Sequence, residues 1–405
     1  MSAVDSAFVI ICAMLVMLMT PALALFYGGL VRSRNVLSTT MHSFSLLGLV
    51  PVLWAVAGYS LAFGPDVGGL IGGVSHLFLD GVGLEPSGYA QTIPDALYMI
   101  FQCMFAVLTV ALVSGAYAER IHFPAMLLFS ALWLLFVYCP MAHWVWGRGW
   151  LAQLGALDFA GGTVVHMTSG AGALAVAHAL GPRLHLGRED GEGTGPHNLP
   201  MTLLGGGLLW FGWFGFNSGS ALSAGPLAAH ALVTTHMGAA AGVLGWLLVE
   251  WRYMGKPTTL GAASGALAGL VAITPAAGFV GVFPAILIGF VGGLVCYGGV
   301  LLKNRFGYDD ALDVVGIHGA GGTWGALATG VFAGAAVNGV DGLIYGNAYQ
   351  LSVQLLSVVA AWGFGYVASR ALLYAVDKLV GLRVRPEAED VGLDISEHNE
   401  RAYQI

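Results

Sequence analysis

Charged residues are scarce in this sequence. Only 9% of the 405 residues are Asp, Glu, Lys or Arg, whereas about a quarter of residues are charged in typical soluble domains. Hydrophobic residues make up 57% of the chain, which also contains 61 glycines. This composition excludes an ordinary soluble domain and indicates an integral membrane protein. We expect the lipid bilayer as its surroundings and no nucleic acid as a partner.

Cysteine is also rare. Cys12, Cys103, Cys139 and Cys296 all lie in apolar stretches, and their separations match no metal-binding or redox motif. We therefore expect these side chains to pack as small hydrophobic residues. The sequence predicts neither a bound metal nor a cofactor.

Long uncharged runs predict helices that cross a membrane. Two of these runs are 57 and 46 residues long, at 193–249 and 257–302. A helix needs about 20 apolar residues to span a bilayer, so each run must hold two helices, separated near 219–226 and 274–278. The weakly alternating strands of an outer-membrane barrel do not produce such runs.

The fold class is therefore an all-α polytopic membrane protein with eleven transmembrane helices. The predicted spans are 7–31, 39–63, 96–118, 121–142, 159–180, 199–219, 227–249, 258–274, 279–302, 313–334 and 348–374. The segment 64–95 is expected to be a glycine-rich outer loop.

Positive charges lie on alternate connections between these spans. Of the 15 lysines and arginines, all but Arg148 fall on one side, including Arg188 in the polar loop 181–198. Because positive charge near span ends stays in the cytoplasm, we expect the amino terminus outside and the carboxyl terminus inside. The chain then divides into a transmembrane domain, 1–379, and a cytoplasmic tail, 380–405. The expected location is the inner (cytoplasmic) membrane, crossed many times.

Two predicted spans carry the same pattern, an aspartate eight residues before a histidine. The pairs are Asp158 with His166 and Asp310 with His318. Five spans separate the two copies, so they enter the membrane from opposite sides, which is typical of an inverted repeat, here spans 1–5 and 6–10. At 1.5 Å per residue each histidine lies about 12 Å below its own surface, so in a core about 30 Å thick the two can meet near the midplane.

Ionisable side chains inside a membrane span usually have a function. A lone histidine can also be a satisfied hydrogen-bonding group between helices, and we interpret His42, His178, His230 and His236 in that way. The repeated spacing favours a functional pair for His166 and His318. Metal binding is the competing role, but two imidazoles without a nearby Cys, Asp or Glu make a poor metal site.

Aromatic residues gather in the outer halves of several spans, as in FQCMF (101–105), AHWVWG (142–147) and WFGFNSGS (213–220). An aromatic belt at the membrane interface explains many of them. The last segment differs because it mixes aromatic rings with Asn217, Ser218 and Ser220 near a helix end. Such a combination suits a small cation, which gains up to about 2 kcal/mol from cation–π attraction when it is partly desolvated.

With these segments the chain resembles the ammonium transporter family (Amt/Mep/Rh), on its bacterial branch. The resemblance covers nearly the whole length. Besides the segments above it rests on FYGGLVRSRNVLS (26–38), GYSLAFG (58–64), GAYAERIHF (115–123), LDFAGGTVVH (157–166), ITPAAG (273–278), DDALDVVGIHG (309–319) and GLRVRPEAEDVGLDISEHNERAY (381–403). Each motif alone is weak evidence for the family, but together and in the family's order the motifs are highly specific.

The resemblance assigns roles to individual residues. It implies an outer cation site formed by Phe105, Trp146 and Ser220, and a gate formed by the stacked rings of Phe105 and Phe216. His166 and His318 resemble the family's pore histidines. Asp158 matches an acid that supports the outer site from behind without touching substrate. Thr274 matches another polar residue near the vestibule, to which we also assign a supporting role.

The resemblance also implies a homotrimer with one pore per subunit and a tail that responds to a PII signal protein. Two departures stand out. The tail motif His-Gly-Glu is His398-Asn399-Glu400 here, and the FQG motif is FQC, with Cys103 near the gate.

The expected function is transport of ammonium or ammonia across the membrane. Three alternatives share parts of the pattern: an ammonium sensor that signals through its tail, an intramembrane enzyme and a channel for neutral gases. No H-E-x-x-H motif occurs, and Ser169-Gly170 lacks the preceding glycine of a serine-hydrolase elbow. Trp146 and Ser220 favour recruitment of a cation over entry of a gas.

Overall fold

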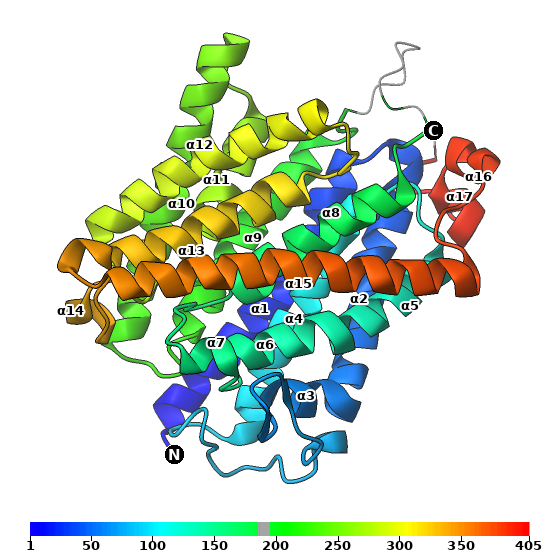
Figure 1. Cartoon of the computed structure of the whole chain (residues 1–405). Helices are drawn as coiled ribbons and strands as arrows, with labels where there is room; N and C mark the ends of the chain where they lie inside the picture. Colours follow the sequence, from blue (N-terminus) through cyan, green and yellow to red (C-terminus); the bar gives the residue numbers. More distant parts are fainter. Residues whose placement is uncertain (185, 187–194, 405) are drawn as a thin grey trace.

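The structure, a computed structural model, describes residues 1–184, 186 and 195–404. Arg188 and the centre of the polar loop 181–198 lie outside these residues. Helices occupy each predicted span, so the chain forms a helical bundle (Figure 1). In chain order the helices at the predicted spans are α1 (Ala3–Leu30), α2 to α3 (Val36–Leu53 and Tyr59–Phe63, joined by η2, Trp54–Gly58), α4 (Asp95–Tyr117), α5 to α6 (Phe123–Trp133 and Cys139–Val145, joined by η4, Leu134–Tyr138), η5 with α8 (Gly162–Met167 and Thr168–Leu180) and α9 (Leu199–Gly219). They continue with α10 (Pro226–Met254), α11 (Thr259–Ile273), α12 (Val282–Phe306), η6 with α13 (Val315–Gly319 and Ala320–Phe332) and α15 (Ala348–Val380).

Length and apolar composition mark most of these helices as membrane spans. Among the described residues, nine helices are long and apolar enough to cross a bilayer. The eighth and tenth predicted spans, α11 and η6 with α13, are not among the nine. The two long uncharged runs do break where predicted, between α9 and α10 and between α11 and α12. The all-α prediction therefore holds for the bundle.

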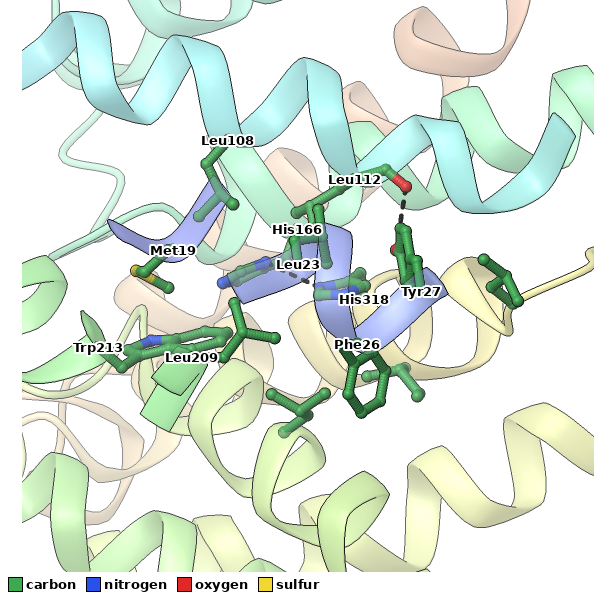
Figure 2. Close-up of a pocket in the computed structure, with 13 residues that line it drawn as sticks. Met19, Leu23, Phe26, Tyr27, Leu108, Leu112, His166, Leu209, Trp213 and His318 are labelled. Carbon is green, nitrogen blue, oxygen red and sulfur yellow. Dashed lines mark hydrogen bonds between the residues drawn. The ribbon is translucent and has the colours of Figure 1, made fainter. Parts of the chain in front are cut away.

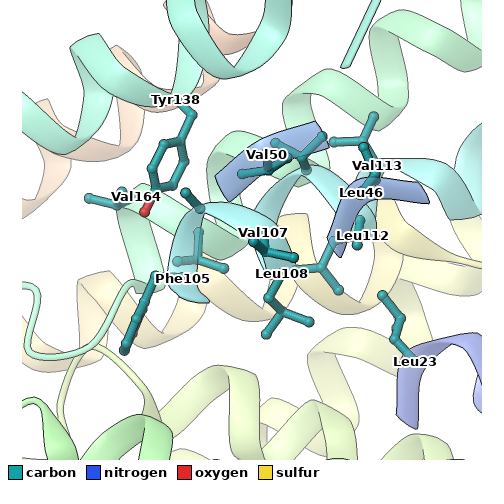
Figure 3. Close-up of a cluster of buried hydrophobic side chains, with 14 of the residues drawn as sticks. Leu23, Leu46, Val50, Phe105, Val107, Leu108, Leu112, Val113, Tyr138 and Val164 are labelled. Carbon is teal, nitrogen blue, oxygen red and sulfur yellow. The ribbon is translucent and has the colours of Figure 1, made fainter. Parts of the chain in front are cut away.

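Burial differs strongly between helices. In its most apolar window α4 is 78% buried and the segment formed by η5 and α8 is 83% buried, whereas α15 is only 33% buried. Apolar side chains of α4 pack against α1, α2 and α8 (Figure 3). The long helix α15 runs along the outside of the bundle, from α14 (Ala335–Asn338) at one end to the tail at the other (Figure 1). Outward-facing apolar residues such as Met14, Leu244 and Val359 suit contact with lipid.

The segment after α3 is not wholly irregular. Asp66–Val67 and Ile71–Gly72 form a short antiparallel hairpin, β1 with β2, and Leu77–Leu79 forms the 3₁₀ turn η3. The prediction of a loop over 64–95 missed this hairpin, because strands of two residues leave no periodic pattern to detect. The short helix α7 (Trp150–Gln153) follows α6, and its first amide, Trp150 N, donates to the oxygen of Gly69 (3.0 Å).

A buried cluster of charges ties together the connections at the tail end of the bundle. Glu119, between α4 and α5, accepts from the side chains of Arg32, Asn35 and Arg183 at 2.9–3.0 Å. Arg183 in turn donates to Asp309. Burial alone would raise the pKa of Glu119, but the guanidinium groups of Arg183 and Arg32 lower that pKa to about 2. Glu119 therefore stays ionised, and the cluster links four segments of the chain.

The tail folds back onto this cluster as α16 (Pro386–Val391) and α17 (Leu393–His398). The amide of Leu393 donates to Asn35 (2.8 Å), and the carboxylate of Asp394 accepts from the amide of Ser38 (2.8 Å). Asn399 ends α17 with φ 55°, in the left-handed region. Asn tolerates this conformation better than other non-glycine residues. The departure from glycine at this position is therefore compatible with the turn.

Candidate functional site

The two predicted pore histidines meet in the centre of the bundle. Nδ1 of His166 and Nδ1 of His318 lie 3.2 Å apart, and both side chains are buried (Figure 2). One imidazole donates its proton to the other in this contact. The depth argument predicted that these two side chains could touch, and the geometry confirms that they do.

Both histidines lie on a short stretch of π-helix, η5 for His166 and η6 for His318. A π-helical turn in an α-helix is often a functional feature, because it changes the direction in which side chains project. Here each π-helical stretch begins the helix that contains it, and each is preceded by an aspartate. The shared spacing in the sequence thus corresponds to a shared local structure.

Asp158 caps the π-helix that contains His166. Its two carboxylate oxygens accept from the amides of Gly161, Gly162, Thr163 and Val164 at 2.6–3.1 Å. Burial raises the pKa of this carboxyl, and the four amide donors oppose that shift because they stabilise the charged form. Asp158 is therefore engaged with the backbone, as the expectation of a supporting role requires.

A narrow cavity surrounds the pair of histidines. Its volume is about 10 Å³, which corresponds to room for about one water-sized molecule. Apolar side chains make up most of its wall, among them Met19, Leu23, Leu108 and Leu209 (Figure 2). Nε2 of His166 is buried and has no hydrogen-bond partner among the described residues. The site thus combines an apolar lining with one ring nitrogen that is available to a small polar molecule.

Trp213 is a site residue that the sequence reasoning missed. Its indole stacks on the ring of His166, with centroids 5.3 Å apart and an interplanar angle of 26°. The indole Nε1 donates to Oγ1 of Thr274 (2.8 Å). The spacing of three residues between Trp213 and Phe216 could have indicated a shared helix face. Thr274 is thus linked to His166 through Trp213, and it does not line the outer cavity described next.

Phe105 and Phe216 lie on the side of the histidines that faces the predicted outer site. Their rings stack with centroids 4.2 Å apart and an interplanar angle of 27°, and both are buried. Phe216 also lies 6.1 Å from the ring of His166. The two phenyl rings therefore stand between the histidine pair and the next cavity along the bundle.

That outer cavity brings the predicted cation-site residues together. It has a volume of about 370 Å³ and is lined by Phe105, Trp146, Asp158 and Ser220, among others. Trp146 packs edge-on against Phe105, and its Nε1 donates to the backbone oxygen of Asp158 (2.9 Å). Ser220 donates to the backbone oxygen of Phe216 (2.9 Å), which leaves its oxygen lone pairs free to accept.

Known proteins resemble this chain along almost its entire length. The ammonium transporter from Bacillus subtilis (strain 168) is 55% identical over 403 residues, which cover 99% of this chain and 98% of that protein. Ammonium transporter Amt1 from Archaeoglobus fulgidus is 47% identical over 403 residues, which cover 100% of both chains.

Solved structures show the same fold. Mep2 of Saccharomyces cerevisiae superimposes with a TM-score of 0.89 at 36% sequence identity, over 96% of this chain and 88% of that one. A structure described as a sensor Amt protein gives a TM-score of 0.91 at 30% identity, over 98% of both chains. The sequence profile of the Ammonium Transporter Family matches residues 7–403. This chain therefore belongs to the ammonium transporter family.

Proposed function

We propose that this multi-pass membrane protein transports ammonium by binding the cation outside, removing its proton and conducting ammonia past the histidine pair. Membership of the family establishes ammonium transport, so the chain is a transporter and not an enzyme. What we propose is which residues bind and deprotonate ammonium, and in what order these steps occur. The single observation that supports it best is the contact between His166 and His318 inside an apolar cavity of about 10 Å³.

Recruitment takes place in the outer cavity. The faces of Trp146 and Phe105 attract a cation, and the oxygen of Ser220 accepts one of its N–H bonds. The cavity of about 370 Å³ admits a hydrated ion that exchanges part of its water for aromatic faces. Asp158 attracts the cation through its negative charge but does not bind it, because both of its oxygens already accept from backbone amides.

Deprotonation follows from the cost of moving a charge into the apolar pore. An unpaired ion in such surroundings costs many kcal/mol, and a group that can lose its charge does so. Ammonium becomes ammonia when it gives one proton to an acceptor, and Nε2 of His166 is available for that role. The cation passes the stacked rings of Phe105 and Phe216 before it gives up this proton near His166, and ammonia then follows the two imidazoles. The proton moves through the contact between the Nδ1 atoms.

The same reasoning explains selectivity against potassium. Potassium has no proton to lose, and the described residues that line the histidine cavity are mostly apolar, unlike the carbonyl ring of potassium filters that replaces the ion's water. It would therefore enter the apolar cavity as a bare ion. A pore of this kind should conduct ammonium nitrogen and reject potassium.

The wider architecture belongs to the same proposal. Eleven spans would place the amino terminus outside and the tail inside, with spans 1–5 and 6–10 as an inverted repeat. The transmembrane domain would be residues 1–379 and the regulatory tail 380–405. We further propose a homotrimer in the inner (cytoplasmic) membrane, with a PII signal protein as the partner of its cytoplasmic face. The matching π-helices around His166 and His318 support the repeat.

Currents measured on purified protein in liposomes test the mechanism. A solid-supported membrane experiment should show a current with ammonium and none with potassium. His166→Ala and His318→Ala should each abolish it. His178→Ala is a matched control, because His178 lies on α8, which directly follows the π-helix of His166, but contacts Tyr366 at the surface (3.0 Å). Unchanged currents in both pore variants, or a large potassium current in the unsubstituted protein, would contradict the mechanism.

A further inference from the structure

Arg148 carries a positive charge beside the outer cavity. It follows Trp146 by two residues, in the connection between α6 and α7, and it is exposed. In the predicted topology it is the one Lys or Arg on the outer side of the membrane. A guanidinium group is always charged in proteins. A cation that approaches the outer cavity therefore meets a fixed charge of the same sign.

The side chain of Arg148 is held against the wall of this cavity. Its Nη2 donates to the backbone oxygen of Gly88 (2.6 Å), and its Cζ lies 4.8 Å from the ring centroid of Tyr89. Tyr89 lines the outer cavity together with Trp146, and its hydroxyl donates to the backbone oxygen of Gly147 (3.3 Å). The guanidinium therefore contacts a ring that forms part of the cavity wall.

The backbone of Arg148 has an unfavourable conformation for a residue with a side chain. Its φ is 68°, in the left-handed region that glycine adopts readily. Residues held in this region often have a function. The cation–π contact with Tyr89 and the hydrogen bond to Gly88 offset the cost and fix the position of the charge.

The charge of Arg148 is not neutralised by a carboxylate. Among the residues that the structure describes, its guanidinium contacts a carbonyl and an aromatic ring but forms no ion pair. Two acids of the same outer region have other partners. Asp66 pairs with His143 (2.9 Å), and Asp95 accepts from the hydroxyl of Tyr59 (2.7 Å). The full charge of Arg148 therefore acts on the cavity.

We propose that Arg148 sets the affinity of the outer site for ammonium by repelling the cation. The repulsion is stronger in a partly desolvated cavity than in bulk water. Moderate binding favours passage, because a transported ion must leave its site as well as enter it. This inference rests on the proposed function, because it requires ammonium to bind beside Trp146.

Arg148→Gln tests the role of the charge, since glutamine is neutral but keeps an N–H donor for the oxygen of Gly88. We expect the half-saturating ammonium concentration to fall about threefold at low ionic strength. The maximal current should not change, because the histidine pair is untouched. The difference should disappear in 1 M salt, because the Debye length falls from about 30 Å at 0.01 M to about 3 Å. Solid-supported membrane currents at graded ammonium concentrations measure both quantities, with the chloride of the bulky cation N-methyl-D-glucamine as the salt.

Further variants isolate the charge from the shape of the side chain. Arg148→Lys keeps the charge and should keep the half-saturating concentration, whereas Arg148→Glu should lower it further than Arg148→Gln. Arg252→Gln is the matched control, because Arg252 is exposed near the other end of α10. It lies about 38 Å along that helix from Leu227, which lines the outer cavity. Its removal should leave the currents unchanged.

Arg148→Asn keeps the inference testable if Arg148→Gln does not fold, because asparagine is neutral and tolerates a φ of 68°. An unchanged or raised half-saturating concentration in the neutral variants would overturn the inference. A fall of the same size in 1 M salt, where the Debye length is about 3 Å, would overturn it too.

Trp146→Leu separates this inference from the proposed function. It should raise the half-saturating concentration, because the cation loses an aromatic face. An unchanged value would contradict the outer site itself, and the role of Arg148 with it. A raised value in Trp146→Leu without a shift in Arg148→Gln would overturn only the role of Arg148.

Discussion

At the scale of single residues, the site depends on aromatic and apolar neighbours that fix the position of His166. Trp213 stacks on one face of its ring, and Phe216 lies on the same side of the pore. Trp213 can hold this position because its indole N–H is bonded to Thr274, which is itself bonded to the oxygen of Leu270 (2.7 Å). The hydroxyl of Thr274, which does not line the histidine cavity, thus holds the indole of Trp213, which does.

Thr274→Val tests this arrangement. Valine has nearly the same shape but cannot accept the indole hydrogen bond, so a buried N–H is left without a partner. We expect a loss of about 1–2 kcal/mol in the free energy of unfolding and a current several-fold below normal. Thermal unfolding in detergent and liposome currents provide the two measurements. Thr274→Ser keeps the hydroxyl and should behave normally, whereas equal effects of both changes would assign Thr274 to packing alone.

At the scale of helices, the histidine contact depends on the close approach of α8 and η6. A Cβ atom built at Gly170 would collide with the backbone Cα and N of Gly319. Glycine at this crossing lets the two backbones touch, as small residues commonly do between membrane helices. The crossing lies four residues after His166 and one residue after His318, so it sets how far apart the rings are.

Gly170→Ala should push these helices apart. We expect destabilisation of at least about 1–3 kcal/mol, as for other overpacked sites, and a loss of current because the Nδ1 atoms separate. Gly207→Ala on α9 is the control, since a Cβ there meets nothing within 4 Å and alanine favours a helix by up to about 1 kcal/mol. Unfolding temperatures and ammonium currents of the two glycine variants are compared with those of the unsubstituted protein. A normal current in Gly170→Ala would show that the crossing does not set the distance.

At the scale of the whole molecule, the charge cluster around Glu119 joins connections that are far apart in the sequence. Glu119 has φ 71°, an unfavourable conformation for a residue with a side chain. Its carboxylate pairs with Arg32 and Arg183 at 2.9–3.0 Å and compensates for that cost. The cluster contacts the tail through Asn35, which accepts from Leu393. Assembly of the tail end of the bundle should therefore depend on one carboxylate.

Glu119→Gln should be strongly destabilising, by about 3–5 kcal/mol, because the buried guanidinium group of Arg32 loses its counter-charge and that of Arg183 keeps only Asp309. Glu387→Gln, at an exposed position of α16, should have almost no effect. Thermal unfolding of the purified protein measures both. Equal unfolding temperatures for the two variants would show that the cluster contributes little.

The same carboxylate predicts how stability depends on pH. The pKa of Glu119 is lowered from 4.5 to about 2 in the folded protein. A lowered pKa stabilises the fold above the unfolded value, so this contribution is complete above about pH 4.5 and is lost as the pH falls toward 2. The unfolding temperature should drop through this window, and the drop should be smaller in Glu119→Gln. Identical profiles would argue against the predicted ionisation.

The sequence by itself determined the membrane class, the approximate positions of the helices and the pairing of His166 with His318. These properties follow from long uncharged runs and from a repeated spacing, which local residue patterns encode directly. Only the tertiary structure decided that Trp213 stacks on His166, that Glu119 gathers two arginines and that Arg148 lies over the ring of Tyr89. Such contacts join residues from distant segments, and no periodicity within one segment records which side chains meet when the helices pack.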